Sequence, residues 1–154
     1  MIYLECYADE ALVKSFGVTS KMIKHAFNKG EVCNLLSKSS NNIGIVDEDP
    51  SSGKPKYERQ MLTKIVFENQ LLKVCEDKST NNKLIVLRPR LEDFIIRIAR
   101  ESNLLNERIP MEASKLYEFL THRRSVQKFE LFKDFIQQLS KENDTMIKFI
   151  NFIK

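Results

Sequence analysis

Two short apolar segments that end in acidic residues constrain the fold of this chain most strongly. The segment Ile2–Cys6 is apolar and β-prone until it reaches Glu5, and Asn42–Asp49 (NIGIVDED) runs through an apolar stretch into Asp47, Glu48 and Asp49. A compact apolar run of this kind is typical of a strand that is buried on both faces, as in a parallel sheet. The sequence therefore predicts an α/β fold with carboxylates at the carboxyl ends of two buried strands.

The rest of the first two-thirds of the chain alternates between helical and strand patterns. Residues 71–75 and 83–87 are predicted strands. Predicted helices cover 9–17, 19–27, 58–69 and 91–101, and a short helical turn is predicted at 32–36. The helix over 19–27 is predicted from the helical spacing of its apolar residues Met22, Ile23, Ala26 and Phe27. In 58–69, the β-branched Ile65 and Val66 weaken the helix prediction. This alternation predicts a mostly parallel sheet flanked by helices.

Beyond Ser102 the pattern is entirely helical, with predicted helices over 111–122, 126–139 and 145–153. We therefore expect an α/β core over 1–101 and a C-terminal helical extension over 102–154. The large phenylalanine faces of this extension either pack on the core or mediate association, including homo-oligomer formation.

Composition excludes several classes of protein. The chain has 154 residues and a net charge of +4, which is compatible with a nucleic-acid partner without establishing one. No apolar run is long enough to cross a membrane, and the acidic N-terminus does not resemble a signal peptide. The scattered Cys6, Cys33 and Cys75 form no CxxC pair, and His25 and His122 are isolated, so we expect a cytoplasmic protein without a zinc site.

The acids at the strand ends predict a metal site. Alternation along an extended strand gives Asp47 and Asp49 the same orientation, and Glu5 joins them if the two strands are adjacent and parallel. Three carboxylates held so close repel one another unless a cation neutralises them. Oxygen ligands without cysteine or clustered histidine select Mg²⁺ or Mn²⁺. The alternative is a solvated acidic loop after the second strand, with Glu5 as a helix-capping acid.

Two motifs resemble the Toprim family. Glu5-Cys-Tyr-Ala-Asp9, followed by a predicted helix, resembles its first motif, and Ile45-Val-Asp-Glu-Asp49 resembles its second motif, an apolar strand that ends in DxD. Toprim domains occur in primases, topoisomerases, recombination proteins and overcoming-lysogenization-defect nucleases. The resemblance covers roughly residues 1–100. It implies a Toprim-like α/β core and metal-dependent phosphodiester hydrolysis on nucleic acid, with DNA as the expected substrate.

The resemblance also implies roles for individual acids. Glu5 would be the general acid/base or a metal ligand, and Asp47 and Asp49 would bind Mg²⁺. A further acid often completes the nuclease version of this site, and Asp9 is one candidate for it.

Other candidates follow the strand over 83–87. Glu92 or Asp93 can supply the further acid, although acids at the start of a helix also stabilise the helix dipole. Arg88 and Arg90 can grip phosphate or stabilise transition-state charge, or can instead pair with neighbouring acids. Lys54 can touch a phosphate, although its loop lacks the residues of a P-loop.

Departures from the Toprim pattern leave two functions open. Cys6 stands where these domains usually have glycine, and the loop over 50–55 differs from the usual sequence after DxD. The chain is predicted to be a nuclease or nuclease subunit, working with an ATPase partner as Toprim nucleases often do. Alternatively, it is a catalytically silent binding or regulatory module. Tyr7 and Tyr57 lie near the predicted site and can stack on bases, but packing is the more frequent role of such residues.

Overall fold

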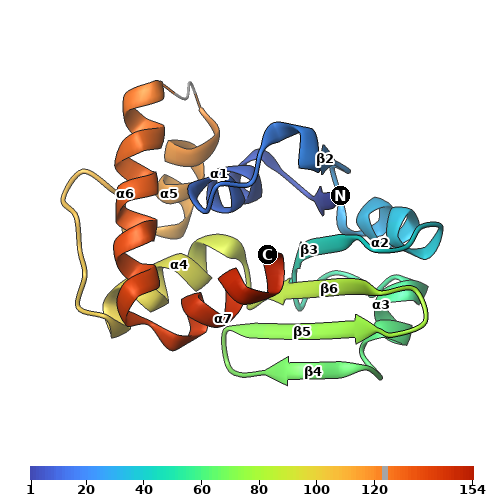
Figure 1. Ribbon diagram of the computed structural model, residues 1–154. Coiled ribbons are helices and arrows are strands. Elements are labelled where there is room, and N and C mark those ends of the chain that lie inside the picture. The colour runs from blue at the N-terminus through green and yellow to red at the C-terminus, as the bar shows by residue number, and fades with distance from the viewer. Residues whose placement is uncertain (123–124) are drawn as a thin grey trace.

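The computed structural model describes residues 1–122 and 125–154 and has an α/β fold (Figure 1). The strands in this part of the chain are β1 (Ile2–Leu4), β2 (Ile23–His25), β3 (Ile43–Asp47), β4 (Ile65–Glu68), β5 (Leu72–Asp77) and β6 (Asn82–Leu87). The helices are α1 (Tyr7–Ser15), the short 3-10 helix η1 (Ser20–Met22), α2 (Lys29–Ser37), α3 (Lys56–Met61), α4 (Leu91–Glu101), α5 (Ala113–Thr121), α6 (Val126–Glu142) and α7 (Asp144–Ile153).

The strands form one sheet in the order β2-β1-β3-β6-β5-β4, and most of the strand pairs are parallel. β1 lies directly beside β3, with Leu4 opposite Ile45. β5 and β4 complete the sheet as an antiparallel meander. The four parallel strands therefore end at one common edge of the sheet, here called the carboxyl edge.

Each face of the sheet is covered by a separate hydrophobic layer. Side chains such as Tyr3, Val46 and Val86 pack against α2 and α3 on one face. Helix α2 lies close to β3, since a Cβ on Gly44 would be 2.8 Å from a methyl carbon of Val32. Side chains such as Leu4 face the larger layer, which contains α1 and α4.

The C-terminal helices contribute to the larger layer. Phe132 of α6 and Phe149 of α7 are fully buried in the same cluster as Leu72 and Ile85 of the sheet. Figure 1 shows α6 beside α1, with which it packs, and α7 next to β5. The phenylalanines of the helical extension thus bury much of their surface within the same molecule.

Two predicted helices are wrong in part. The segment predicted as a helix over 19–27 contains only η1, followed by β2, because Ile23, Lys24 and His25 pair with β1 as an edge strand. In the segment predicted as a helix over 58–69, only the first part is helical, and the β-branched Ile65 and Val66 form β4 beside β5. In the described part of the chain, no helix combines the length and apolar character needed to cross a membrane.

Candidate metal centre

The carboxyl edge brings Glu5 and Asp47 together. Glu5 follows β1 directly, and Asp47 is the last residue of the neighbouring β3. The Asp47 backbone N–H donates to the Glu5 carboxylate at 2.9 Å. The adjacent, parallel arrangement on which the predicted metal site depends is therefore present.

Asp9 and Glu92 join this pair from two helix starts. Asp9 lies in the first turn of α1 and is only 4% exposed, and its carboxylate accepts a hydrogen bond of 2.9 Å from the Cys6 N–H. Glu92, in the first turn of α4, is 7% exposed. The Asp47 carboxylate accepts at 2.9 Å from the N–H of Leu91, the first residue of that helix. We call Glu5, Asp9, Asp47 and Glu92 the acid cluster.

Burial raises the pKa of every member of the acid cluster, and repulsion within the cluster adds to this for Asp47 and Asp9. Burial, with the repulsion of Asp9, Glu5 and Glu92, raises the pKa of Asp47 to about 8 despite the Leu91 hydrogen bond. Burial also raises the pKa of Asp9 to about 7, with the Cys6 N–H opposing it and the charges of Glu5 and Glu92 adding to it. Burial raises the pKa of both Glu5 and Glu92 as well. The cluster thus holds carboxyl groups whose ionisation the protein itself does not fully compensate.

A buried ion pair that sequence analysis missed lies beside Glu5. Lys29, at the start of α2, is 8% exposed, and Glu58 of α3 is 1% exposed. The Lys29 ammonium donates to the Glu48 carbonyl at 2.7 Å and lies 3.7 Å from the Glu58 carboxylate. Its charge favours the ionised form of Glu5. No sequence signal distinguishes this pair from ordinary surface charges.

The position of Asp49 is set by the turn that follows β3. β3 ends at Asp47, and Asp49 has a positive φ of 38°, so strand alternation does not set its orientation. Its carboxylate accepts from the Ser51 hydroxyl at 2.8 Å and lies 3.8 Å from the exposed Arg90 guanidinium. Asp49 remains close enough for its charge to raise the pKa of Glu5.

Arg88 and Lys54 interact with acids outside the acid cluster. Both Arg88 side-chain contacts to Glu48 are short, at 3.0 and 3.2 Å, and a further contact of 3.0 Å reaches Glu68. Pairing with neighbouring acids thus occupies this guanidinium. Lys54 is exposed, and its charge favours the ionised forms of Glu48 and Glu58.

A cleft of about 720 Å³ opens beside the acid cluster, and α5 supplies one of its walls. Asp47, Arg90 and Glu92 line one side, while Tyr117 and His122 are among the residues on the α5 side. The sequence carries no signal that connects α5 with the site, because only tertiary packing brings this helix to the carboxyl edge.

The acid cluster fits a hard divalent cation in the chemistry of its donors. Within residues 1–122 and 125–154, no ion pair joins a cation to Glu5, Asp9, Asp47 or Glu92. In the same residues, no three His, Cys, Asp or Glu side chains already have an arrangement that would hold a metal ion. The backbone hydrogen bonds to Glu5, Asp9 and Asp47 leave further carboxylate lone pairs available.

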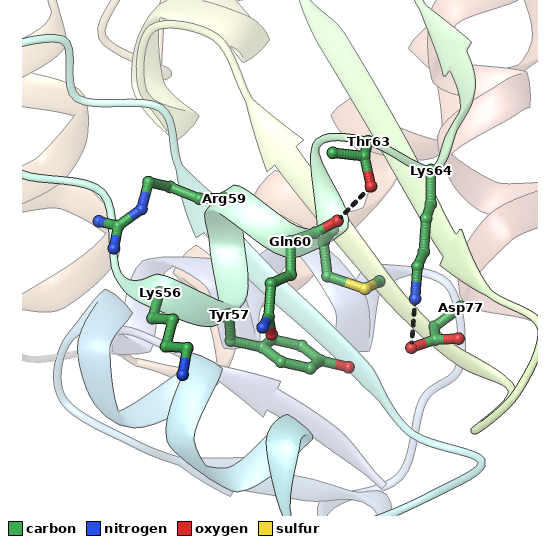
Figure 2. A pocket seen from close by; sticks show the side chains of 8 residues that line it. Lys56, Tyr57, Arg59, Gln60, Thr63, Lys64 and Asp77 are labelled. Atoms are coloured by element: carbon green, nitrogen blue, oxygen red, sulfur yellow. Dashed lines mark hydrogen bonds and ion pairs between the residues drawn. The ribbon is translucent and has the colours of Figure 1, made fainter.

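A second pocket, of about 590 Å³, lies along α3 and is lined by Tyr57, but it contains none of the predicted catalytic, metal-binding or phosphate-binding residues (Figure 2). Figure 2 shows Lys64 and Asp77 directed toward each other, with 2.8 Å between the ammonium and the carboxylate. Arg59 points away from that pair and donates to the Lys54 carbonyl at 2.6 Å. Two of the basic side chains here therefore already have partners.

Comparison of the chain with protein-family models, curated proteins and solved structures gives no significant match.

Proposed function

We propose that this protein carries out metal-dependent phosphodiester hydrolysis on nucleic acid, with DNA as the substrate, as a Toprim-type nuclease or nuclease subunit. The observation that carries the proposal is the acid cluster itself. Four carboxylates, one directly after β1 and the others from α1, β3 and α4, influence one another electrostatically at the carboxyl edge, where α/β sheets bind ligands. Buried carboxylates in mutual repulsion favour a divalent cation, and oxygen donors select Mg²⁺ or Mn²⁺.

In this proposal the acid cluster would hold the ion, with Glu5 and Asp47 as the central ligands and Asp9, Asp49 and Glu92 as candidates to complete the set. Once bound, a divalent ion polarises a phosphate and lowers the pKa of water. Glu5 lies at the cluster, and burial raises its pKa, which favours a role for this carboxyl group in proton transfer. Metal binding would displace the protons that Asp9 and Asp47 retain near neutral pH.

The cleft beside the cluster supports the assignment of a phosphate-containing substrate. Its volume of about 720 Å³ is in the range of sites that hold a small organic ligand, and nucleotides are of that size. Arg90 lines it with an exposed guanidinium that can pair with a phosphate. Lys54 supplies a further exposed cation, whose charge acts on Glu48 and Glu58, whereas Arg88 would act by holding Glu48 and Glu68.

The partners and compartment belong to the same proposal. Toprim nucleases often act with an ATPase, and we propose an ATPase partner for this chain on that resemblance. A cytoplasmic location fits the three free cysteines, of which Cys33 and Cys75 are buried.

The direct test is cleavage of plasmid and single-stranded DNA by the purified protein with Mg²⁺ or Mn²⁺. Cleavage that disappears in Glu5→Gln and Asp47→Asn, but persists in the exposed-acid variant Glu107→Gln, supports the proposal. Equal cleavage by the wild-type protein and both cluster variants would show that a contaminating nuclease is responsible.

A second candidate is a silent Toprim-like module that binds nucleic acid or regulates a partner. The finding that favours it is that no preformed metal-holding group is present among the described residues. A protein that binds DNA but remains inert with every divalent metal, alone and with its ATPase partner, would support this alternative.

A further inference from the structure

Three aromatic rings form a row at the carboxyl edge, on the far side of Glu5 from Asp47. The ring centroids of Tyr7 and His25 are 4.4 Å apart, and those of His25 and Phe27 are 6.4 Å apart. Tyr7 begins α1, His25 ends β2, and Phe27 follows that strand. We call these three residues the aromatic row.

His25 is fixed in the middle of the row. It lies opposite Leu4 in the parallel pairing of β2 with β1, so it sits one residue before the level of Glu5. Its Nε2 lies 2.7 Å from the Glu10 carboxylate, which also forms an ion pair with Lys14. The central ring is thus held by strand pairing and by α1, which gives the two outer rings a rigid support.

The outer rings are presented to solvent. Tyr7 is 53% exposed and Phe27 is 76% exposed, although large aromatic side chains usually bury most of their surface. Phe27 also has a φ of +65°, a left-handed backbone conformation that is strained for a bulky side chain. Neither burial of the ring nor backbone preference explains a phenylalanine at this position, whereas a ligand that stacks on the ring does.

The aromatic row is continuous with the acid cluster. The Ala26 N–H donates to the Leu4 carbonyl at 2.8 Å, which places the residue before Phe27 beside the residue before Glu5. The adjoining η1–β2 segment carries two exposed lysines, of which Lys24 alternates with His25 along β2 and so faces the other side of the sheet, whereas Lys21 lies in η1. Exposed aromatic rings together with nearby cations bind single-stranded nucleic acid, because bases stack on the rings while cations pair with the phosphates.

We propose that the aromatic row is a base-stacking platform for single-stranded nucleic acid, with Tyr7 and Phe27 as the stacking rings. The inference rests on the proposed function in one respect, namely that the bound nucleic-acid strand continues from the aromatic row to the acid cluster. Bases at the platform would position the neighbouring phosphate at Glu5 and Asp47. Duplex DNA keeps its bases stacked internally and would gain little from these rings.

Binding of a fluorescent 12-nucleotide oligo(dT) tests the platform. The assay uses the full chain in a Glu5→Gln background with Mg²⁺, so that binding is measured without cleavage. Phe27→Ala and Tyr7→Ala are each expected to weaken binding about tenfold, the effect of losing one stacked base. Met22→Ala is the matched control, because Met22 is a 48% exposed apolar residue in the adjoining η1. An abasic oligomer of equal length should bind all four proteins alike.

A glycine substitution separates binding from folding. Phe27→Gly accepts the left-handed conformation without strain, so it should melt at a higher temperature than the parent and still bind oligo(dT) about tenfold more weakly. Unchanged oligo(dT) affinity in the Phe27 variants, or an equal loss for the abasic oligomer, would overturn the platform. Platform-dependent binding by a wild-type protein that never cleaves DNA would instead contradict only the proposed function.

Discussion

The Glu5 carboxylate accepts a hydrogen bond of 2.9 Å from the backbone N–H of Asp47, across a sequence separation of 42 residues. This contact exists because β1 and β3 are neighbours in the sheet and end at the same edge. It fixes the Glu5 side chain over the end of β3, so that the charge of Glu5 acts directly on Asp47. The two acids therefore titrate, and would bind a cation, as parts of one cluster.

Glu5→Gln should strongly reduce the proposed metal-dependent DNA cleavage without unfolding the protein. Glutamine retains a side-chain oxygen that can accept from the Asp47 N–H, but it loses the charge and the titratable proton. We expect metal-dependent DNA cleavage to fall by about a hundredfold or more, the usual contribution of a general acid/base. Thermal melting without metal should show a fold at least as stable as that of the wild-type protein. Retention of full cleavage by Glu5→Gln would remove Glu5 from the catalytic site.

Stability without metal should decline as pH rises. Asp9 and Asp47 have ordinary pKa values of 3.8, and burial with neighbouring charge raises these to about 7 and about 8 in the folded protein. Between about pH 4 and pH 8 the folded state binds more protons than the unfolded state, so the free energy of unfolding falls across that window. Denaturant titrations at pH 5.5 and pH 8.5 in EDTA measure this decline. Added Mg²⁺ should restore more stability at the higher pH.

Asp47→Asn isolates the contribution of one acid. Asparagine can still accept from the Leu91 N–H but cannot ionise, so the variant should be about 1 kcal/mol or more stable than wild type at pH 8.5 in EDTA. It should also lose most of the stabilisation by Mg²⁺. Asp134→Asn, at an exposed position on α6, is the control and should behave as wild type. A fall in stability for Asp47→Asn at pH 8.5 would contradict the repulsion inferred here.

The strands that end at the acids, β1 and β3, could be predicted from the sequence, whereas the edge strand β2 could not. Apolar runs that end in acids identify β1 and β3 because both strands are buried. β2 is held mainly by pairing with β1, and the spacing of Met22, Ile23, Ala26 and Phe27 is equally compatible with a helix. The helix prediction for the second part of 58–69 was wrong for a related reason, because β4 depends on its pairing with β5.

The site was predictable as far as local sequence determines it. Glu5 and Asp47 follow from strand ends, whereas Asp49 lies beyond the end of β3, where the turn sets its position. The ion pair of Lys29 with Glu58 and the wall supplied by α5 depend on long-range packing. Local patterns carry no information about such contacts, because any helix of similar composition could occupy the same place.

Lys29→Met should destabilise the protein through Glu58. Removal of the ammonium leaves a carboxyl group that is 1% exposed without its charged partner, and loss of one member of a buried ion pair typically costs about 3 kcal/mol. The double variant Lys29→Met/Glu58→Gln should recover part of this loss, which denaturant titration of both variants measures. A double variant as unstable as the single one would show that the Lys29 contact with the Glu48 carbonyl dominates instead.

Phe149→Ala should test how tightly the helical extension is bound to the sheet layer. Phe149 of α7 is fully buried, and its ring centroid lies 5.9 Å from that of Phe94 in α4 and 6.3 Å from that of Phe16 after α1. Removal of this ring leaves a cavity between three segments, so the free energy of unfolding should fall by about 3–5 kcal/mol in one cooperative transition. Ile147→Ala, at a position that is 37% exposed on the same helix, should change it by less than about 1 kcal/mol. A separate early transition for Phe149→Ala, followed by a second cooperative transition, would instead show that residues 1–101 fold independently of the extension.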